Sequence, residues 1–265
     1  MNEKTYVLQG IANLMSLRRQ KRDWDDLANL DPLWAILSHK NKKFRWDLNE
    51  FFSTGQTEID EIIKIAEQLD YPRARGLALD FGCGVGRLTR AFAKSFQECY
   101  GVDISEIMIT KAKILNQSIP NCKFILNTKN DLKVFQNNYF DLIYTNLVLQ
   151  HLPDKKMIKS YLIEFVRILK KDGLLIFQLP HYYPMTYRVL IPVRRLAYIF
   201  LTSVGCNKKF IFEKLNLHPM RLNFIPEQEV IEFLETSRAK VLKIQINSYG
   251  GILNKSRTYF VTKDT

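Results

Sequence analysis

The stretch that decides the fold is LALDFGCGVGRLTRAF, residues 77–92. An apolar run with Asp80 near its end is followed by glycines at every second position, Gly82, Gly84 and Gly86. The residues that follow the glycines have a helical pattern. A strand, a glycine turn and a helix in this order are typical of sites where bare backbone approaches a nucleotide-like ligand.

Strands and helices alternate along the rest of the chain. We expect strands over residues 76–82, 99–104, 122–126, 139–146 and 173–180, with helices over 87–96, 105–117 and 154–170 between them. A helix over 226–237 and strands over 239–247 and 257–263 complete the pattern. The alternation predicts an α/β fold with a doubly wound parallel sheet.

Two segments lie outside this alternation. Residues 1–70 are predicted to form an N-terminal helical cap, because apolar residues recur at helical spacing over 58–69, with Thr57 as the expected helix cap. Residues 181–225, rich in aromatic residues and arginine, are expected to form a helical insertion after the fifth strand, as a wall of the substrate site if the protein has one. The core domain then covers residues 71–265.

Composition narrows the class of protein. A chain of 265 residues with 46% hydrophobic residues suits one α/β domain with additions. The formal charge of +12 can attract nucleic acid, anionic membranes or acidic substrates, although a merely solvated basic surface is the favoured interpretation. Four scattered cysteines, with no recognisable signal peptide or spanning helix, predict a reduced, cytoplasmic protein without structural zinc.

The glycine turn admits two kinds of cofactor. A dinucleotide fingerprint would place its third glycine at position 87, where Arg87 stands, and Asp80 would repel a pyrophosphate. The same carboxylate attracts the ammonium and sulfonium of S-adenosylmethionine. Asp103, at the end of the second expected strand, can accept hydrogen bonds from ribose hydroxyls. The alternative role of Asp103, capping the next helix, is one that Ser105 can fill.

Four motifs resemble, in order and spacing, those of class I S-adenosylmethionine-dependent methyltransferases, in their small-molecule (type 11/25-like) branch. They are LDFGCGVGRLT, YGVDIS, FDLIYTNLVLQHLP and LKKDGLLIF, and the match covers roughly residues 75–180. The resemblance implies a Rossmann-like seven-stranded sheet of order 3-2-1-4-5-7-6 with the last strand antiparallel. It also implies S-adenosyl-L-methionine as cofactor and S-adenosyl-L-homocysteine as product.

The same resemblance assigns cofactor contacts to particular positions. They are Asp80, Gly82, Gly84, Gly86, Asp103, Ile104, Asp131, Leu132 and Asn146. The adenine end departs from the family pattern, because Asn127 and Thr128 stand where Gly-Asp is common. The contacts expected at Asp131 and Leu132 are therefore the least supported by the motif.

Candidate groups at the reacting end are two histidines and three aromatic residues. Methyl transfer is mostly a matter of positioning, with a base where the acceptor must lose a proton. His151 and His181 follow the fourth and fifth expected strands and are candidate bases, with structural hydrogen bonding as the alternative. Trp46, Phe51 and Phe52 are a candidate lid over the cofactor, or else simply pack the cap on the core.

The function expected from these features is methyl transfer to oxygen or nitrogen of a small metabolite, such as a sugar, a lipid-like molecule or a secondary metabolite. Alternatives are an RNA or protein methyltransferase, a cofactor-binding scaffold without activity, and an NAD dehydrogenase. Nucleic acid is not favoured, because TNLV at residues 145–148 replaces the motif of amino-methylating enzymes. Residues 196–201 beside Arg194 and Arg195 suggest at most a weak peripheral contact with membrane lipid. The oligomeric state stays open.

Overall fold

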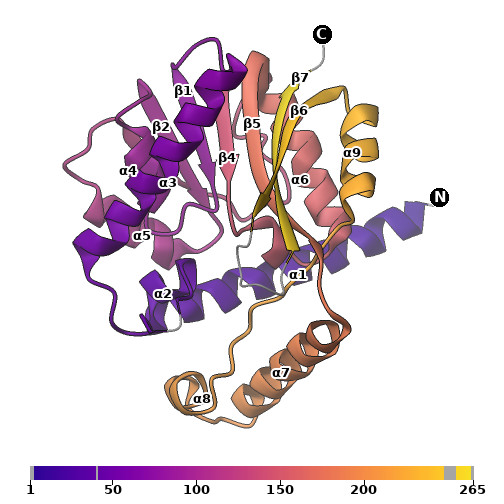
Figure 1. The fold of residues 1–265 in the computed structure, drawn as a ribbon. Coiled ribbons are helices and arrows are strands. Elements are labelled where there is room, and N and C mark those ends of the chain that lie inside the picture. The colour runs from indigo at the N-terminus through magenta and orange to yellow at the C-terminus, as the bar shows by residue number, and fades with distance from the viewer. Residues whose placement is uncertain (1–2, 40, 248–254, 264–265) are drawn as a thin grey trace.

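The computed structural model describes the backbone of residues 3–39, 41–247 and 255–263. Within these ranges, the burial and contacts of side chains are described from residue 16 onward. The elements in chain order are α1 (Glu3–Leu30), α2 (Pro32–Ile36), α3 (Leu48–Leu69), β1 (Leu77–Phe81), α4 (Arg87–Phe92), β2 (Glu98–Asp103), α5 (Glu106–Leu115), β3 (Cys122–Leu126), β4 (Phe140–Thr145), the short 3₁₀ helix η1 (Leu149–His151), α6 (Lys155–Ile168), β5 (Leu169–Tyr182), α7 (Met185–Ser203), α8 (Lys208–Lys214), α9 (Glu227–Thr236), β6 (Ala239–Asn247) and β7 (Lys255–Lys263). Figure 1 shows a central twisted sheet with helices packed around it.

The sheet has the predicted order. Its described strands run β3-β2-β1-β4-β5-β7-β6. The pairs β1–β2, β2–β3, β1–β4 and β4–β5 are parallel, whereas β7 runs antiparallel to both β5 and β6. The chain order reverses on either side of β1, and the carboxyl ends of β1, β2 and β4 meet at one edge. Ligands of open α/β sheets bind at such a reversal point.

Each face of the sheet is covered by its own hydrophobic cluster, because successive strand residues point to opposite faces. On β1, Leu79 joins the cluster that α6 covers, whereas Ala78 joins the cluster under α3 and α4. Phe165 of α6 and Phe92 of α4 are both fully buried in these two clusters. Coverage of both faces explains why the central strands are almost continuously apolar.

The N-terminal segment is helical, but its third helix begins earlier than the sequence suggested. Asp47 is the N-cap of α3, and its side chain accepts a hydrogen bond from the Glu50 amide at 2.9 Å. Thr57, the expected cap, lies inside the helix, where its hydroxyl donates to the Ser53 carbonyl. The prediction of Thr57 was wrong, because Asp47 caps a helix that begins at Leu48 and so has nearly three further turns, at about 3.6 residues per turn.

The segment after β5 forms the helices α7 and α8. Both helices lie apart from the sheet, on the far side of α1 (Figure 1). Two ion pairs connect them to α1, one between Arg195 and Asp23 and one between Lys208 and Asp26, at 2.9 and 2.7 Å. No helix in the described ranges combines the length and apolar character that a membrane crossing needs.

Candidate active site

The glycine turn after β1 has a backbone that only glycine adopts easily. The φ angles of Gly82, Gly84 and Gly86 are 80°, 54° and 85°, in the left-handed region where a Cβ atom is disfavoured. A Cβ atom on Gly82 would lie 2.3 Å from a methyl group of Val148, and one on Gly84 would lie 2.4 Å from Ile36. The turn therefore needs glycine for both its conformation and its close neighbours.

Asp103, at the end of β2, braces this turn. Its carboxylate accepts hydrogen bonds from the amides of Gly84 and Ser105, at 2.9 and 2.8 Å. Desolvation raises the pKa of Asp103, an effect that these backbone donors oppose. Ser105, not Asp103, caps α5 by accepting from the Met108 amide. The carboxylate is thus left at the edge of the turn, where a ligand hydroxyl can reach it.

A pocket opens where β1, β2 and β4 end. Its lining comprises Leu17, Gln20, Trp24, Ala35, Ile36, Phe81, Gly82, Gly84, Val102, Asp103, Ile104, Met108, Asn146, Leu147, Val148, His151, Leu152 and Tyr161. Two lining oxygens, Gln20 Oε1 and Asn146 Oδ1, are buried without a hydrogen-bond partner among the described residues. A ligand that brings ammonium or hydroxyl donors would satisfy them, because a buried unpaired acceptor is costly.

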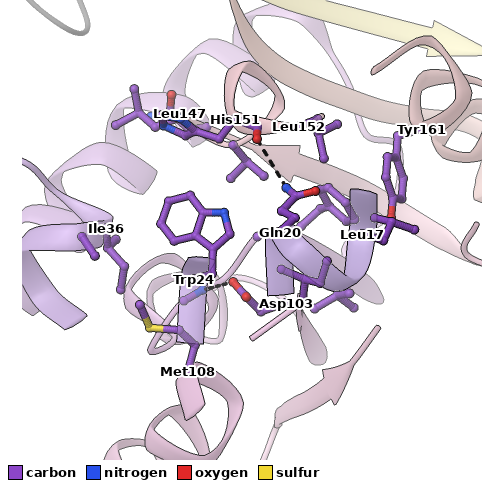
Figure 2. A pocket seen from close by; sticks show the side chains of 18 residues that line it. Leu17, Gln20, Trp24, Ile36, Asp103, Met108, Leu147, His151, Leu152 and Tyr161 are labelled. Carbon is purple, nitrogen blue, oxygen red and sulfur yellow. Dashed lines mark hydrogen bonds between the residues drawn. The ribbon is translucent and has the colours of Figure 1, made fainter. Parts of the chain in front are cut away.

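The N-terminal helices form the roof of this pocket. Figure 2 shows the Trp24 ring between Asp103 and Met108 on one side and Leu147 and His151 on the other. The rings of Trp24 and His151 meet edge-on with centroids 5.5 Å apart. The enclosed volume is about 80 Å³, whereas pockets for ligands of this kind hold roughly 300–1,000 Å³. A nucleoside cofactor therefore fits only when the roof side chains shift.

Asp80 lies behind the pocket and is not one of its lining residues. Its carboxylate is buried and accepts a hydrogen bond from the Thr89 hydroxyl at 2.6 Å. Desolvation raises the pKa of Asp80 to about 7, against the opposing effects of Thr89 and of the nearby Arg87 guanidinium. A cation that approaches the turn would favour the ionised carboxylate.

Glu58 of α3 is a site residue that the sequence did not single out. Its carboxylate accepts from Arg87, Tyr144 and Asn146, at 2.8, 2.8 and 2.7 Å. These contacts fix the side-chain amide of Asn146 and leave its unpartnered oxygen at the pocket. The sequence did hold a signal for this role. Glu58 lies four residues before the buried Ile62, so an acid stands on the apolar face of α3, where a charged residue is unexpected.

His151 faces the pocket, but it is also part of a hydrogen-bonded wall. Its Nδ1 atom is 2.6 Å from the Arg221 carbonyl, so this nitrogen carries the proton and donates it. Its Nε2 atom is 3.2 Å from the Gln150 amide nitrogen. Desolvation lowers the pKa of His151 to about 4, so the ring is neutral near pH 7.

The other predicted residues lie outside this pocket, as far as the described residues show. His181 is not in the lining, and burial together with the Arg257 charge lowers its pKa. Gly86 packs against Asn116 and Phe124 of the neighbouring elements. Leu132 is buried in the main core, and the Asp131 carbonyl accepts from Asn127. Gly82, Gly84, Asp103, Ile104 and Asn146 are the predicted residues that the fold brings together.

The predicted aromatic lid has a different position. Trp46, Phe51 and Phe52 stack edge-on in a cluster between the N-terminal helices, with Phe51 fully buried. None of the three lines the pocket. These three residues therefore pack the N-terminal cap onto the core. The aromatic residue that lies over the glycine turn is Trp24 of α1.

Comparison with known proteins agrees with a nucleoside-binding α/β fold. Residues 79–177 match the family model described as "Methyltransferase domain". The chain is 28% identical to a trans-aconitate 2-methyltransferase of Enterobacter sp., over 59% of this chain and 73% of that protein. It is 32% identical to an uncharacterised methyltransferase, YcgJ, of Bacillus subtilis, over 50% and 49%.

Solved structures share the fold at low identity. An S-adenosylmethionine-dependent methyltransferase from Clostridium acetobutylicum superposes with a TM-score of 0.59 at 17% identity, covering 88% of this chain and 98% of that one. Magnesium protoporphyrin IX methyltransferase from Synechocystis, with bound S-adenosylhomocysteine, gives 0.54 at 17%, covering 88% and 93%.

These findings define the class of the protein. Its fold is that of an α/β methyltransferase, with a pocket at the carboxyl ends of β1, β2 and β4. Residues 79–177 are a methyltransferase domain, and the chain is similar to S-adenosylmethionine-dependent methyltransferases, which makes S-adenosylmethionine its cofactor. It spans 73% of the Enterobacter relative but only about half of YcgJ, so the acceptor does not follow from either relative.

Proposed function

We propose that this enzyme transfers the methyl group of S-adenosylmethionine to an oxygen or nitrogen of a small metabolite. The observation that carries the proposal is the roof: α1 crosses the pocket and places Gln20 and Trp24 over the glycine turn. Once the roof side chains have shifted to admit the cofactor, a small acceptor can reach it beneath α1. A base inside a nucleic-acid duplex or a folded protein segment would have to displace it.

The cofactor fits the residues that are present. We assign the ribose hydroxyls to Asp103 and the methionine ammonium to the region of Gly82 and Asn146, with Asp80 supplying negative charge from behind. The positive-φ glycines and the unpartnered Asn146 oxygen support these assignments. Ile104 and Met108 supply an apolar wall on the Asp103 side of the pocket.

The chain's own contribution to the reaction is positioning and exclusion of water. When bound, the cofactor supplies an electrophilic methyl group on a good leaving group. The apolar roof residues Leu17, Trp24 and Ile36 keep water away from that carbon. Glu58 holds the Asn146 amide in one orientation, which limits the rotations of the methionine end.

The names of two relatives are consistent with a small acceptor group. The Enterobacter relative is named for trans-aconitate, and a Coxiella burnetii relative, 31% identical, is named for the malonyl group on acyl carrier protein. The experiment that tests the proposal offers methyl-labelled cofactor to separate metabolite, RNA and protein fractions of a cell extract. Label in the metabolite fraction alone is expected, and label confined to RNA or protein would contradict the proposal.

His151 is the candidate base that the pocket contains. The variant His151→Asn keeps a side-chain donor near the position of Nδ1 while removing the basic nitrogen. If His151 takes the acceptor proton, kcat should fall by about 100-fold or more, with the Kd for S-adenosylhomocysteine nearly unchanged. Steady-state kinetics and calorimetry check this, and an unchanged kcat would leave only the structural contact to Arg221.

A further inference from the structure

Helix α7 carries an unusual apolar face. Six large apolar side chains are each between 55% and 70% exposed: Met185, Val189, Val193, Leu196, Phe200 and Val204. Their spacing of three or four residues places them on one side of the helix. We call these six residues the α7 stripe. Single exposed apolar residues are ordinary, but a continuous stripe of this length marks an interaction surface.

The flank and the opposite side of α7 already make contacts within the protein, so the stripe cannot turn inward. Tyr198 is buried, and the Arg195 guanidinium pairs with Asp23 of α1 and donates to the Pro219 carbonyl. Arg188 stacks on Phe224 with its guanidinium carbon 4.5 Å from the ring centre. These contacts fix the rotation of the helix and hold the stripe toward solvent.

The segment around the stripe is strongly basic. Residues 181–225 contain seven lysines and arginines but only one acid, Glu213, a net charge of +6 out of the chain's formal +12. Arg188 beside the stripe is exposed and bonds a carbonyl, that of Tyr183, so its charge is not cancelled there. Lys208 and Lys209 follow on α8, with side chains 46% and 68% exposed, and they pair with Asp26 and Glu213. Asp23 and Asp26 of α1 offset two of the six net positive charges, so this surface keeps a net charge of +4.

We propose that the α7 stripe docks on the surface of an anionic lipid bilayer. A helix with an apolar face and basic flanks lies in the membrane interface, with its apolar side chains between the acyl chains and its cations near the phosphates. A second copy of this chain is the less favoured occupant. A symmetric contact through α7 would bring two basic surfaces together, each still positive after Asp23 and Asp26 of α1 are counted, and like charges repel.

The test measures sedimentation with vesicles of phosphatidylcholine alone and of an equimolar mixture with phosphatidylglycerol. The full chain is expected to sediment with the mixed vesicles and to be released by added salt, because salt screens the attraction. Leu196→Glu/Phe200→Glu should lower the partition constant by at least about tenfold. The matched control is Ile114→Glu/Ile163→Glu, which adds the same charge at exposed apolar positions of α5 and α6.

A second measurement does not depend on variants at the stripe. Cys206 is the exposed cysteine among the free cysteines and lies two residues beyond Val204. An environment-sensitive fluorophore on Cys206 should shift to the blue with mixed vesicles. Binding of S-adenosylhomocysteine by each variant verifies that it is folded.

Three outcomes would overturn the proposal. The first is absence of binding to the mixed vesicles at low salt, together with an unshifted fluorophore. The second is an equal loss of binding in the control variant on α5 and α6. The third is a dimer in light scattering that Leu196→Glu/Phe200→Glu dissociates without any vesicle binding, since the stripe would then be a subunit interface.

Discussion

The floor and the roof of the cofactor pocket are held in place by different forces. The floor is backbone and carboxylate: the amides of Gly82 and Cys83 donate to the Val102 carbonyl, and Asp103 accepts from Gly84. The roof is made largely of apolar side chains from α1 and α2, such as Trp24 and Ile36. The floor is therefore suited to directional recognition of a ligand, whereas the roof is suited to excluding water from it.

The floor and the roof also differ in the sequence separation of the contacts that hold them in place. The floor is set by hydrogen bonds between residues close to the ends of adjacent strands, so its shape follows from the strand pairing. The roof depends on contacts between distant parts of the chain, such as the hydrogen bond from Ser105 to Asp25 of α1 at 2.6 Å. A change to the floor should thus cost more cofactor affinity than a change of similar size to the roof.

The largest effect is expected from Gly82→Ala in the floor. The methyl group would meet Val148, and the left-handed backbone disfavours alanine. We expect the free energy of unfolding to fall by about 2–4 kcal/mol and binding of S-adenosylhomocysteine to be lost. Thermal unfolding and calorimetry check this. Adding Val148→Ala should recover part of the stability, and if Gly82→Ala binds normally, the floor is not the recognition surface.

Asp103→Ala should have the next largest effect. It removes an acceptor from the Gly84 and Ser105 amides and from the ribose, so the cofactor should bind about 1–3 kcal/mol more weakly. Titration calorimetry gives the Kd. Asp131→Ala is the matched control: near-normal affinity is expected if Asp131 makes no contact, whereas an equal loss would support the predicted adenine contact. An unchanged Kd for Asp103→Ala would refute the ribose assignment.

A pH dependence of up to about tenfold per unit is expected from Asp80. Its pKa is raised to about 7 in the cofactor-free protein. The cationic cofactor favours the ionised carboxylate, so affinity for S-adenosylmethionine should rise as the pH increases through 7. Binding titrations between pH 6 and pH 8 check this. Asp80→Asn should bind more weakly and without this slope, and a slope that persists in that variant must come from another group.

The same carboxyl predicts the opposite trend for stability. A pKa raised on folding means that the folded protein holds the proton more tightly than the unfolded chain. The contribution of the Asp80 carboxyl to the free energy of unfolding is complete at pH values below its unfolded pKa of about 4. This contribution is lost as the pH rises through the folded pKa of about 7. Asp80→Asn should reduce this fall in melting temperature, which distinguishes a folding effect from a binding effect.

The smallest effect is expected from Trp24→Ala in the roof. The pocket of about 80 Å³ is smaller than a nucleoside needs, and we expect Trp24, which lies across it, to move when the cofactor enters. Without the ring, association and dissociation should both become faster, and the Kd should change by less than about threefold. Stopped-flow binding measures both rates. A loss of affinity as large as that of Asp103→Ala would mean that roof and floor contribute equally to recognition.

The sequence by itself determined the sheet, the glycine turn and the acid at the end of β2. Those features depend on local patterns: strand periodicity, glycines at left-handed positions, and the fixed offset from Gly82 to Asp103. The same local reasoning misplaced the cap of α3 at Thr57, because several residues can cap one helix and propensity does not choose among them.

Only the tertiary structure decided which distant side chains meet at the site. It brought Gln20, Trp24 and Glu58 to the pocket region. It also placed His151 in the pocket lining and left His181 outside it, whereas the sequence made both histidines candidate bases. Contacts between distant segments depend on how helices dock on a finished sheet, and no short motif encodes that docking. The physical reason is that hydrophobic packing is non-directional, so its partners are defined only when the whole chain has folded.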